Sequence, residues 1–190
     1  MELVPRVLIT LPTCVSGVGE ARCEALGPAL GGELLALYRP TPYFAFGGAF
    51  AYGRAGGAVP SGALTAETLA LTLVARVYLL EEGDLDPYLE ALVGWGRDQT
   101  TFRASDANAA SRAQEADSSF GSFGRAGGGI DWFVTSSVKV GLVMAYGQLV
   151  LARGETCRAG RCVAGPAPGG AIRGGVSTGL GLSVLLGPSL

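Results

Sequence analysis

The sequence contains no histidine and few charged residues. Histidine is the side chain used most often for acid–base catalysis near neutral pH, so its absence excludes mechanisms that depend on it. Only 16% of the 190 residues are charged, whereas about a quarter are in typical soluble domains, and the mean hydropathy is positive. A net charge of −2 gives no basic surface for nucleic acid.

Long apolar runs are also missing. No window holds eighteen consecutive apolar residues, so a membrane-spanning helix is excluded and a closed barrel remains as the spanning structure. Met1 leads straight into a strand pattern without the features of a signal peptide, so we expect a mature chain with a start Met if the protein is exported. The length fits a single domain over 1–190.

Glycine, by contrast, is abundant, with 31 residues, which disfavours helices throughout the chain. The clearest pattern is a strict alternation over 171–186. One parity is apolar and the other small or polar, which is typical of a strand with two different faces. At about 3.3 Å per residue this strand is roughly 50 Å long, which suits a barrel with lipid outside and a polar lumen inside.

Seven more segments show the same alternation. The eight predicted strands cover 2–11, 29–39, 43–53, 68–80, 88–98, 120–133, 138–152 and 171–186. Long connections follow the first, third, fifth and seventh strands, over 12–27, 53–66, 99–119 and 153–170, and short turns follow the other three. The parities predicted to face lipid are marked by Val7, Leu34, Phe50, Leu71, Val93, Trp132, Leu142 and Leu180.

This arrangement resembles the small eight-stranded outer-membrane barrels of Gram-negative bacteria, of the OmpA and OmpX type, over nearly all of the chain. The resemblance implies an all-β, antiparallel up-and-down barrel with short periplasmic turns and long outer loops. It also implies a monomer in the bacterial outer membrane. The ending GPSL departs from the aromatic residue that often closes such chains. Enzymes among these barrels depend on histidine, so we expect no catalysis and no cofactor or metal.

The four cysteines lie in the first and last long connections, which are neighbours in a closed barrel. Short spacings favour disulfides Cys14–Cys23 and Cys157–Cys162, because closing a short loop costs little. A zinc site made by all four and free thiols stay open as alternatives.

Charged residues on the inward parities predict a lumen network. Its members are Arg6, Glu33, Arg76, Glu90, Arg125, Lys139 and Arg173, with Asp131 nearer an end and able to reach the mouth. Cations outnumber acids in this set, so we expect Glu33 and Glu90 each to serve several basic partners, and water or an ion to satisfy the surplus.

Polar groups elsewhere have competing interpretations. Four arginines of the outer connections could hold lipopolysaccharide phosphates, or only keep the loops soluble: Arg22, Arg153, Arg158 and Arg161. The acidic run 81–86 is predicted to be a solvated turn, because it lacks the ligand register of a calcium loop. Ser136 and Ser137 are predicted turn residues, and Lys139 a lumen residue, instead of a serine–lysine catalytic pair.

Two functions fit these observations. The first is an integral outer-membrane barrel with a closed polar lumen and a structural or surface-interaction role. The alternative is a soluble lipocalin-like barrel that binds a small apolar ligand. The two functions predict opposite orientations of the strands' faces, because a lipocalin would turn the leucine-rich parity inward and a membrane barrel would turn it toward lipid.

Overall fold

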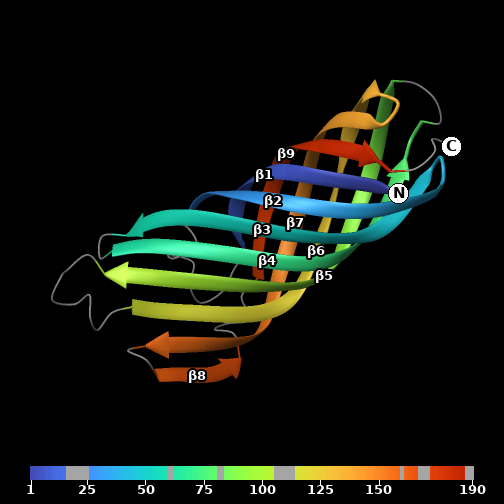
Figure 1. The fold of residues 1–190 in the computed structure, drawn as a ribbon. Coiled ribbons are helices and arrows are strands. Elements are labelled where there is room, and N and C mark those ends of the chain that lie inside the picture. The colour runs from blue at the N-terminus through green and yellow to red at the C-terminus, as the bar shows by residue number, and fades with distance from the viewer. Residues whose placement is uncertain are drawn as a thin grey trace.

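The computed structural model describes residues 1–15, 26–59, 62–80, 84–104, 114–158, 161–166 and 172–186 as a β structure (Figure 1). Its strands are β1 (Glu2–Val15), β2 (Leu26–Thr41), β3 (Phe44–Val59), β4 (Gly62–Tyr78), β5 (Leu85–Ala104), β6 (Gln114–Thr135), β7 (Val138–Arg158), β8 (Arg161–Pro166) and β9 (Ile172–Leu185). Among these residues no helix is long and apolar enough to span a bilayer.

Eight of the strands close into an antiparallel barrel. Consecutive strands pair from β1 to β7, β7 also pairs with β9, and β9 returns to β1. Every strand of this ring therefore has two hydrogen-bonded neighbours, which leaves no open edge in the wall. The short strand β8 lies outside the ring and pairs only with the far end of β7. The all-β, up-and-down architecture predicted from the alternation is confirmed.

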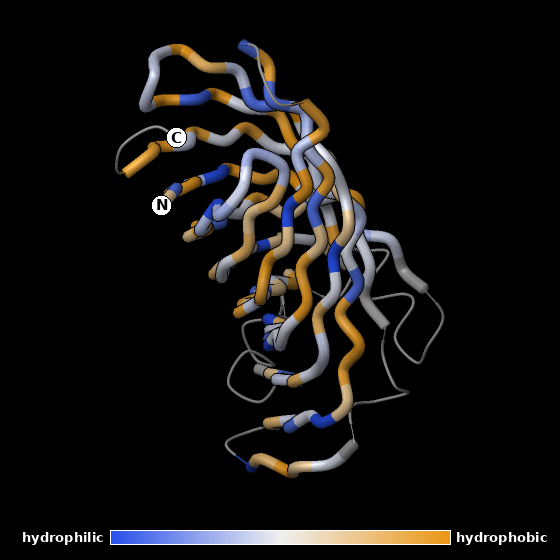
Figure 2. Tube along the Cα trace, turned by 90° about the vertical axis from the view of Figure 1, so that its right-hand side faces the viewer, coloured by the Kyte–Doolittle hydropathy of each residue, from blue (hydrophilic) through white to orange (hydrophobic). Residues whose placement is uncertain are grey.

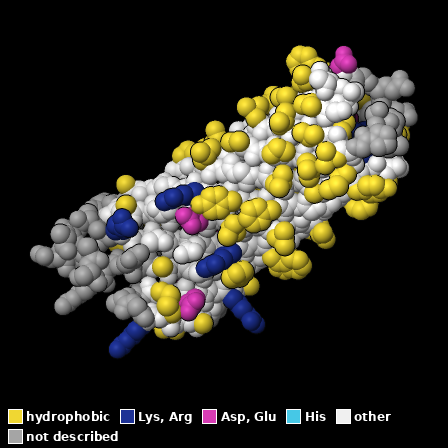
Figure 3. All heavy atoms as spheres, in the orientation of Figure 1, with side chains coloured by type: hydrophobic (Ala, Val, Ile, Leu, Met, Phe, Trp, Pro, Cys, Tyr) yellow, Lys and Arg dark blue, Asp and Glu magenta, His cyan; other side chains and the backbone are white. Residues whose placement is uncertain are grey.

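The two faces of the wall differ as the alternation predicts. The apolar parity is exposed in every strand of the ring, and its members include Val7, Leu34, Phe50, Leu71, Val93, Trp132, Leu142 and Leu180. Along the tube in Figure 2, hydrophobic positions alternate with neutral and hydrophilic ones. Figure 3 shows hydrophobic side chains gathered over the half nearer the short turns, whereas basic side chains appear mainly toward the opposite end. The exterior thus carries an apolar band.

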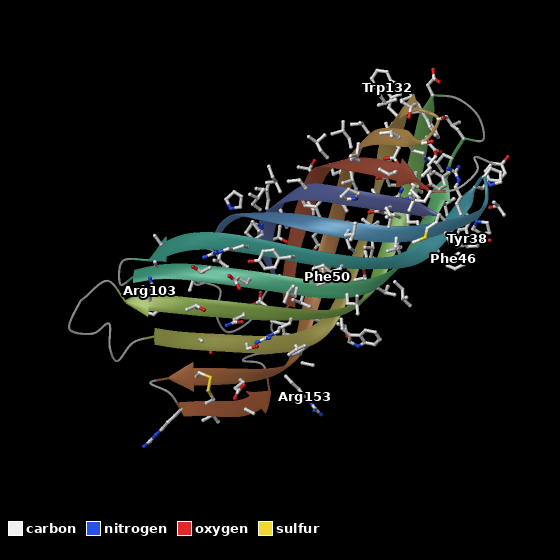
Figure 4. All side chains as sticks on the ribbon, viewed as in Figure 1. Tyr38, Phe46, Phe50, Arg103, Trp132 and Arg153 are labelled. Carbon is white, nitrogen blue, oxygen red and sulfur yellow. A yellow bond between two sulfur atoms is a disulfide. The ribbon has the colours of Figure 1, made fainter. Side chains whose placement is uncertain are left out.

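Aromatic side chains mark the band near the short turns. The ring centroids of Tyr38 and Phe46 are 5.7 Å apart, and those of Phe44 and Phe46 are 6.0 Å apart. Tyr38, Phe46 and Trp132 all lie at this end of the barrel in Figure 4. Outer-membrane barrels carry such aromatic girdles where the membrane meets water. The girdle places one membrane boundary near the short turns.

At the end opposite the short turns, the strands extend further than was predicted from the sequence. The predicted connection 53–66 is mostly ladder, with Val59 opposite Gly62, and the 99–119 and 153–170 connections also contain long paired stretches. These predictions were wrong because backbone pairing holds the strands together there without an apolar outer parity. The remaining residues of the long connections are outside the described ranges.

The short turns lie at one end of the barrel, together with the start of β1 and the end of β9. Thr41 Oγ1 accepts a hydrogen bond from Phe44 N at 3.1 Å, and Thr135 Oγ1 accepts one from Val138 N at 3.1 Å. Met1 and Leu186 exchange backbone hydrogen bonds, which ties the start of β1 to the end of β9. We call this the short-turn end and the opposite one the long-loop end.

Candidate functional site

Charged side chains fill the lumen near the short-turn end. Two oppositely charged pairs follow directly from strand register, because Arg6 of β1 faces Glu33 of β2 and Arg76 of β4 faces Glu90 of β5. The Arg6 and Glu33 side chains are 3.2 Å apart, and those of Arg76 and Glu90 are 3.1 Å apart. Each pair occupies an inward parity, so both point into the barrel.

Glu90 joins these pairs across the lumen. Both carboxylate oxygens accept hydrogen bonds from Arg6, at 2.7 and 2.9 Å, which is a bidentate arrangement. Arg76 Nη2 and Arg125 Nη2 donate to the same carboxylate at 3.1 and 3.2 Å. Arg6 Nη2 also donates to the Tyr88 hydroxyl at 3.0 Å. Glu90 therefore holds three guanidinium groups from three different strands.

Glu33 forms a second bridge. Its Oε2 atom accepts a hydrogen bond from Arg125 Nη2 at 2.7 Å in addition to the one from Arg6. Glu33 and Glu90 thus each serve several basic partners. The structure brings Arg6, Glu33, Arg76, Glu90 and Arg125 into one connected set, which we call the lumen ion cluster.

More acids lie closer to the short turns. Asp131 Oδ2 is 3.4 Å from Arg76 Nη1, and Glu2 Oε1 is 3.8 Å from the same nitrogen. Lys139 Nζ donates to Asp86 Oδ2 at 2.9 Å and lies 4.0 Å from Glu2. Asp131 is therefore not at the solvated mouth where the sequence placed it.

Arg39 and two tyrosines complete this part of the lumen. Arg39 Nη1 donates to Asp86 at 2.8 Å, and its guanidinium lies 3.6 Å from the centre of the Tyr78 ring. The Tyr78 hydroxyl donates to Glu2 Oε2 at 3.2 Å. Ionic and aromatic contacts together fill the space between the strands.

The charged side chains of the lumen near the short-turn end, taken together, are buried and balanced in formal charge. The side chains of Arg76 and Glu90 have no exposed surface. Among the described residues of this half of the lumen, the acids and the cations are equal in number. The buried cations are Arg6, Arg76, Arg125 and Lys139, with partly exposed Arg39 as a fifth, and the buried acids are Glu2, Glu33, Asp86, Glu90 and Asp131. The predicted excess of cations is thus absent from this set. Eight strands leave an interior that side chains can just fill.

Glu2 and Asp86 are lumen acids that were not predicted from the sequence. Asp86 was assigned to a solvated turn, yet it begins the same inward parity that carries Tyr88 and Glu90. Extending each parity to the first residue of its strand would have found both acids. The side chain of the predicted member Arg173 is outside the described part of the structure.

The serine–lysine alternative is not formed. Lys139 is fully buried and ion-paired with Asp86, whereas Ser136 and Ser137 lie exposed in the turn between β6 and β7. The two serines therefore face solvent while the lysine faces the lumen, so they do not form a pair.

Cys157 and Cys162 form a disulfide between directly opposed residues of β7 and β8. This agrees with the predicted pairing and removes both sulfurs as thiolate ligands for zinc. Glu155 lies close to them, but a disulfide is not a metal ligand set. Cys23 and the side chain of Cys14 are outside the described residues.

Peptide mapping without reduction should therefore recover a link between Cys157 and Cys162, and we predict a second link between Cys14 and Cys23. Replacing both Cys157 and Cys162 with serine should leave the unfolding transition of the barrel unchanged, since the β7–β8 hairpin lies outside the ring. A peptide joining the first connection to the last would contradict this pairing.

Arginines on the outer surface lie just beyond the apolar band. Arg54 of β3, Arg97 of β5 and Arg153 of β7 are all exposed. Arg97 lies 5.8 Å from the centre of the Phe120 ring, and Phe120 is the register partner of Arg153. We call Arg54, Arg97 and Arg153 the arginine row. Only Arg153 among them was predicted as an outer anion contact.

The other predicted outer arginines differ in position. Arg161 is exposed on the β8 hairpin, beyond the row. Arg22 and the side chain of Arg158 are outside the described ranges. Figure 4 shows Arg153 and Arg103 toward the long-loop end, away from Tyr38 and Phe46.

Comparison with known proteins gives a likeness in structure alone. No protein-family model and no curated protein matches the sequence. The solved structure of Ail, the attachment invasion locus protein of Yersinia pestis, is similar over 96% of both chains, with 13% identity and a TM-score of 0.59. Neisserial surface protein A is similar over 97% of this chain and 96% of its own, with 14% identity and a TM-score of 0.54.

A protease shares part of the architecture. The outer-membrane protease OmpT of Escherichia coli is similar over 85% of this chain and 65% of its own, with 11% identity and a TM-score of 0.50. Barrels of this kind thus include enzymes as well as other proteins. The closed ring, the apolar exterior and these likenesses show that the chain has the fold of the small bacterial outer-membrane β-barrels.

Proposed function

We propose that this chain is an integral outer-membrane barrel with a closed lumen, and that its role is structural or surface interaction instead of bulk transport. The lumen ion cluster carries this proposal. Buried, mutually paired side chains from β1, β2, β4, β5 and β6 occupy the lumen near the short-turn end. Opening a water path would require separating charges that satisfy one another.

The direction of the two faces supports a membrane location over the lipocalin-like alternative. Leu73 is 68% exposed on β4, and its inward neighbours Thr72 and Val74 are buried. A soluble lipocalin-like barrel would turn this leucine row inward and present the polar parity to water. An exterior this apolar is suited to lipid, because exposed patches of such size are rare on soluble monomers.

A non-catalytic role is part of the proposal. The likeness to OmpT means that the fold itself does not decide this point. The chain has no histidine to act as a base, and Lys139 is held by Asp86. We also propose that the barrel acts as a monomer, since its ring is complete within one chain.

Planar-bilayer recordings on the folded protein test the closed lumen. We expect at most small, flickering conductance, because the paired side chains leave no continuous water path. Protein that was heat-denatured before addition serves as the control for leaks caused by detergent. A steady, porin-sized current would contradict the proposal.

Lipopolysaccharide is the partner that we propose for the outer surface. The arginine row lies next to the apolar band, where the phosphates of an outer-leaflet lipid would lie. Guanidinium groups bind phosphate with two parallel hydrogen bonds. The similar protein Ail has been solved with sucrose octasulfate, a heparin analogue, which supports anion binding on this kind of barrel.

Unfolding in vesicles with and without lipopolysaccharide tests this partner. We expect lipopolysaccharide to stabilise the unmodified barrel, and the triple variant Arg54→Gln, Arg97→Gln, Arg153→Gln to lose most of that gain. Arg161→Gln is the matched control, because it removes one exposed arginine beyond the row. If the triple variant keeps the full stabilisation, the row does not hold the phosphates.

A further inference from the structure

We propose that the lumen toward the long-loop end binds one small, neutral, mainly apolar molecule that carries a hydrogen-bond acceptor. A cavity of about 180 Å³ lies there, lined by residues from all eight strands of the ring. Arg125 belongs both to this lining and to the lumen ion cluster, so the cluster forms its inner end. A cavity closed at one end is compatible with a barrel that does not conduct.

Small inward residues create this space. In the β3–β4 wall, Ala51 lies opposite Ala70 and Ala55 opposite Ala66. A Cβ atom added to Gly53 would meet no atom within 4 Å. Nearer the short turns the same pair of strands carries Arg76, which fills the lumen. The two halves of the lumen are therefore built differently, one packed and one open.

The lining indicates an apolar ligand of limited size. Leu8, Leu26, Phe123 and Leu149 face the space together with the alanines. An engineered cavity of about 150 Å³ lined by apolar side chains binds benzene in another protein. A volume of about 180 Å³ therefore suits a single aromatic ring with a short substituent.

Arg125 indicates where an acceptor would bind. Arg125 is only 6% exposed, and its Nε atom has no hydrogen-bond partner among the described residues. Its Nη2 atom is already paired with Glu33 and Glu90, so two carboxylates lie beside the guanidinium group. An anionic ligand would meet these carboxylates and Asp98, so a neutral acceptor such as a carbonyl oxygen fits better.

Fluorine NMR of 4-fluoroacetophenone with the protein in lipid nanodiscs tests this site, with empty nanodiscs to measure partition into lipid. We expect saturable binding to the unmodified protein. Ala51→Phe should weaken it at least about tenfold by filling the cavity, whereas Ala91→Phe, the same change on the lipid face, should leave it within about twofold. Ala70→Leu fills the same space with a smaller side chain and provides a second test.

The acceptor is tested separately with 4-fluoroethylbenzene, which has a similar size and no carbonyl. We expect its binding to be about tenfold weaker, because the Arg125 Nε–H would lose its partner. Equal binding of the two compounds would overturn the role of Arg125. Two results would overturn the site. The first is a binding signal no larger than that of empty nanodiscs. The second is unchanged binding by both cavity-filling variants, provided that their heat-modifiable gel migration shows that they are folded.

Discussion

Replacing Glu90 with alanine should lower the free energy of unfolding by about 3–5 kcal/mol. Its carboxylate is the shared partner of Arg6, Arg76 and Arg125, and its side chain has no exposed surface. The substitution would leave three buried guanidinium groups facing one another with one carboxylate fewer. Removing one partner from a buried ionic group costs more than the pair contributes, because the remaining charges stay desolvated. Urea titration of the barrel in lipid vesicles measures the change.

Two variants keep this result interpretable. Glu67→Ala removes a partly exposed acid whose oxygen lies 3.7 Å from Arg54, and we expect a change of at most about 0.5 kcal/mol. Glu90→Gln keeps the shape and some hydrogen bonds while it removes the charge, so its effect should fall between the two. If Glu90→Ala were no more destabilising than Glu67→Ala, the cluster would not contribute to the stability of the folded barrel.

Placing arginine at Leu73 should cost about 2–4 kcal/mol in the same assay. Leu73 lies in the middle of the outward row of β4, with Leu71 and Ala75 on either side of it along that face. A charged group there must be desolvated by the acyl chains or distort the bilayer to reach water. The cost should decrease for arginine at positions closer to either end of the row.

Ala58→Arg is the matched control for Leu73→Arg. Ala58 is exposed near the long-loop end of β3, beyond Arg54 and outside the apolar band. Arginine there should be close to neutral in stability. Equal costs at Ala58 and Leu73 would mean that the effect does not come from lipid contact.

The alternation of apolar and polar residues in the sequence was sufficient to predict the strands and the two faces of most of the barrel wall. A period of two assigns every residue of a strand to one face, and in a membrane barrel the two faces meet very different environments. Leu71 and Arg76 were therefore placed on opposite faces before any contact was known, and their exposures agree with this. The short turn at Thr135 was also predictable from its polar residues.

Features that depend on three-dimensional closure were harder to predict. The contact between Arg6 and Glu90 joins residues 84 positions apart and depends on which strands face each other across the lumen. Asp86 looked like a turn residue because only its strand register carries it inward. The cavity depends on small residues from many strands, and no single segment indicates it.

Tryptophan quenching by lipids with brominated acyl chains tests the orientation of the wall most directly. The chain has two tryptophans, Trp95 and Trp132, and Trp95 is 71% exposed on the apolar face of β5. In the Trp132→Phe variant, we expect the fluorescence of Trp95 to be strongly quenched by the brominated chains and little affected by aqueous iodide. Strong quenching by iodide with no effect of the brominated lipid would contradict a lipid-facing exterior.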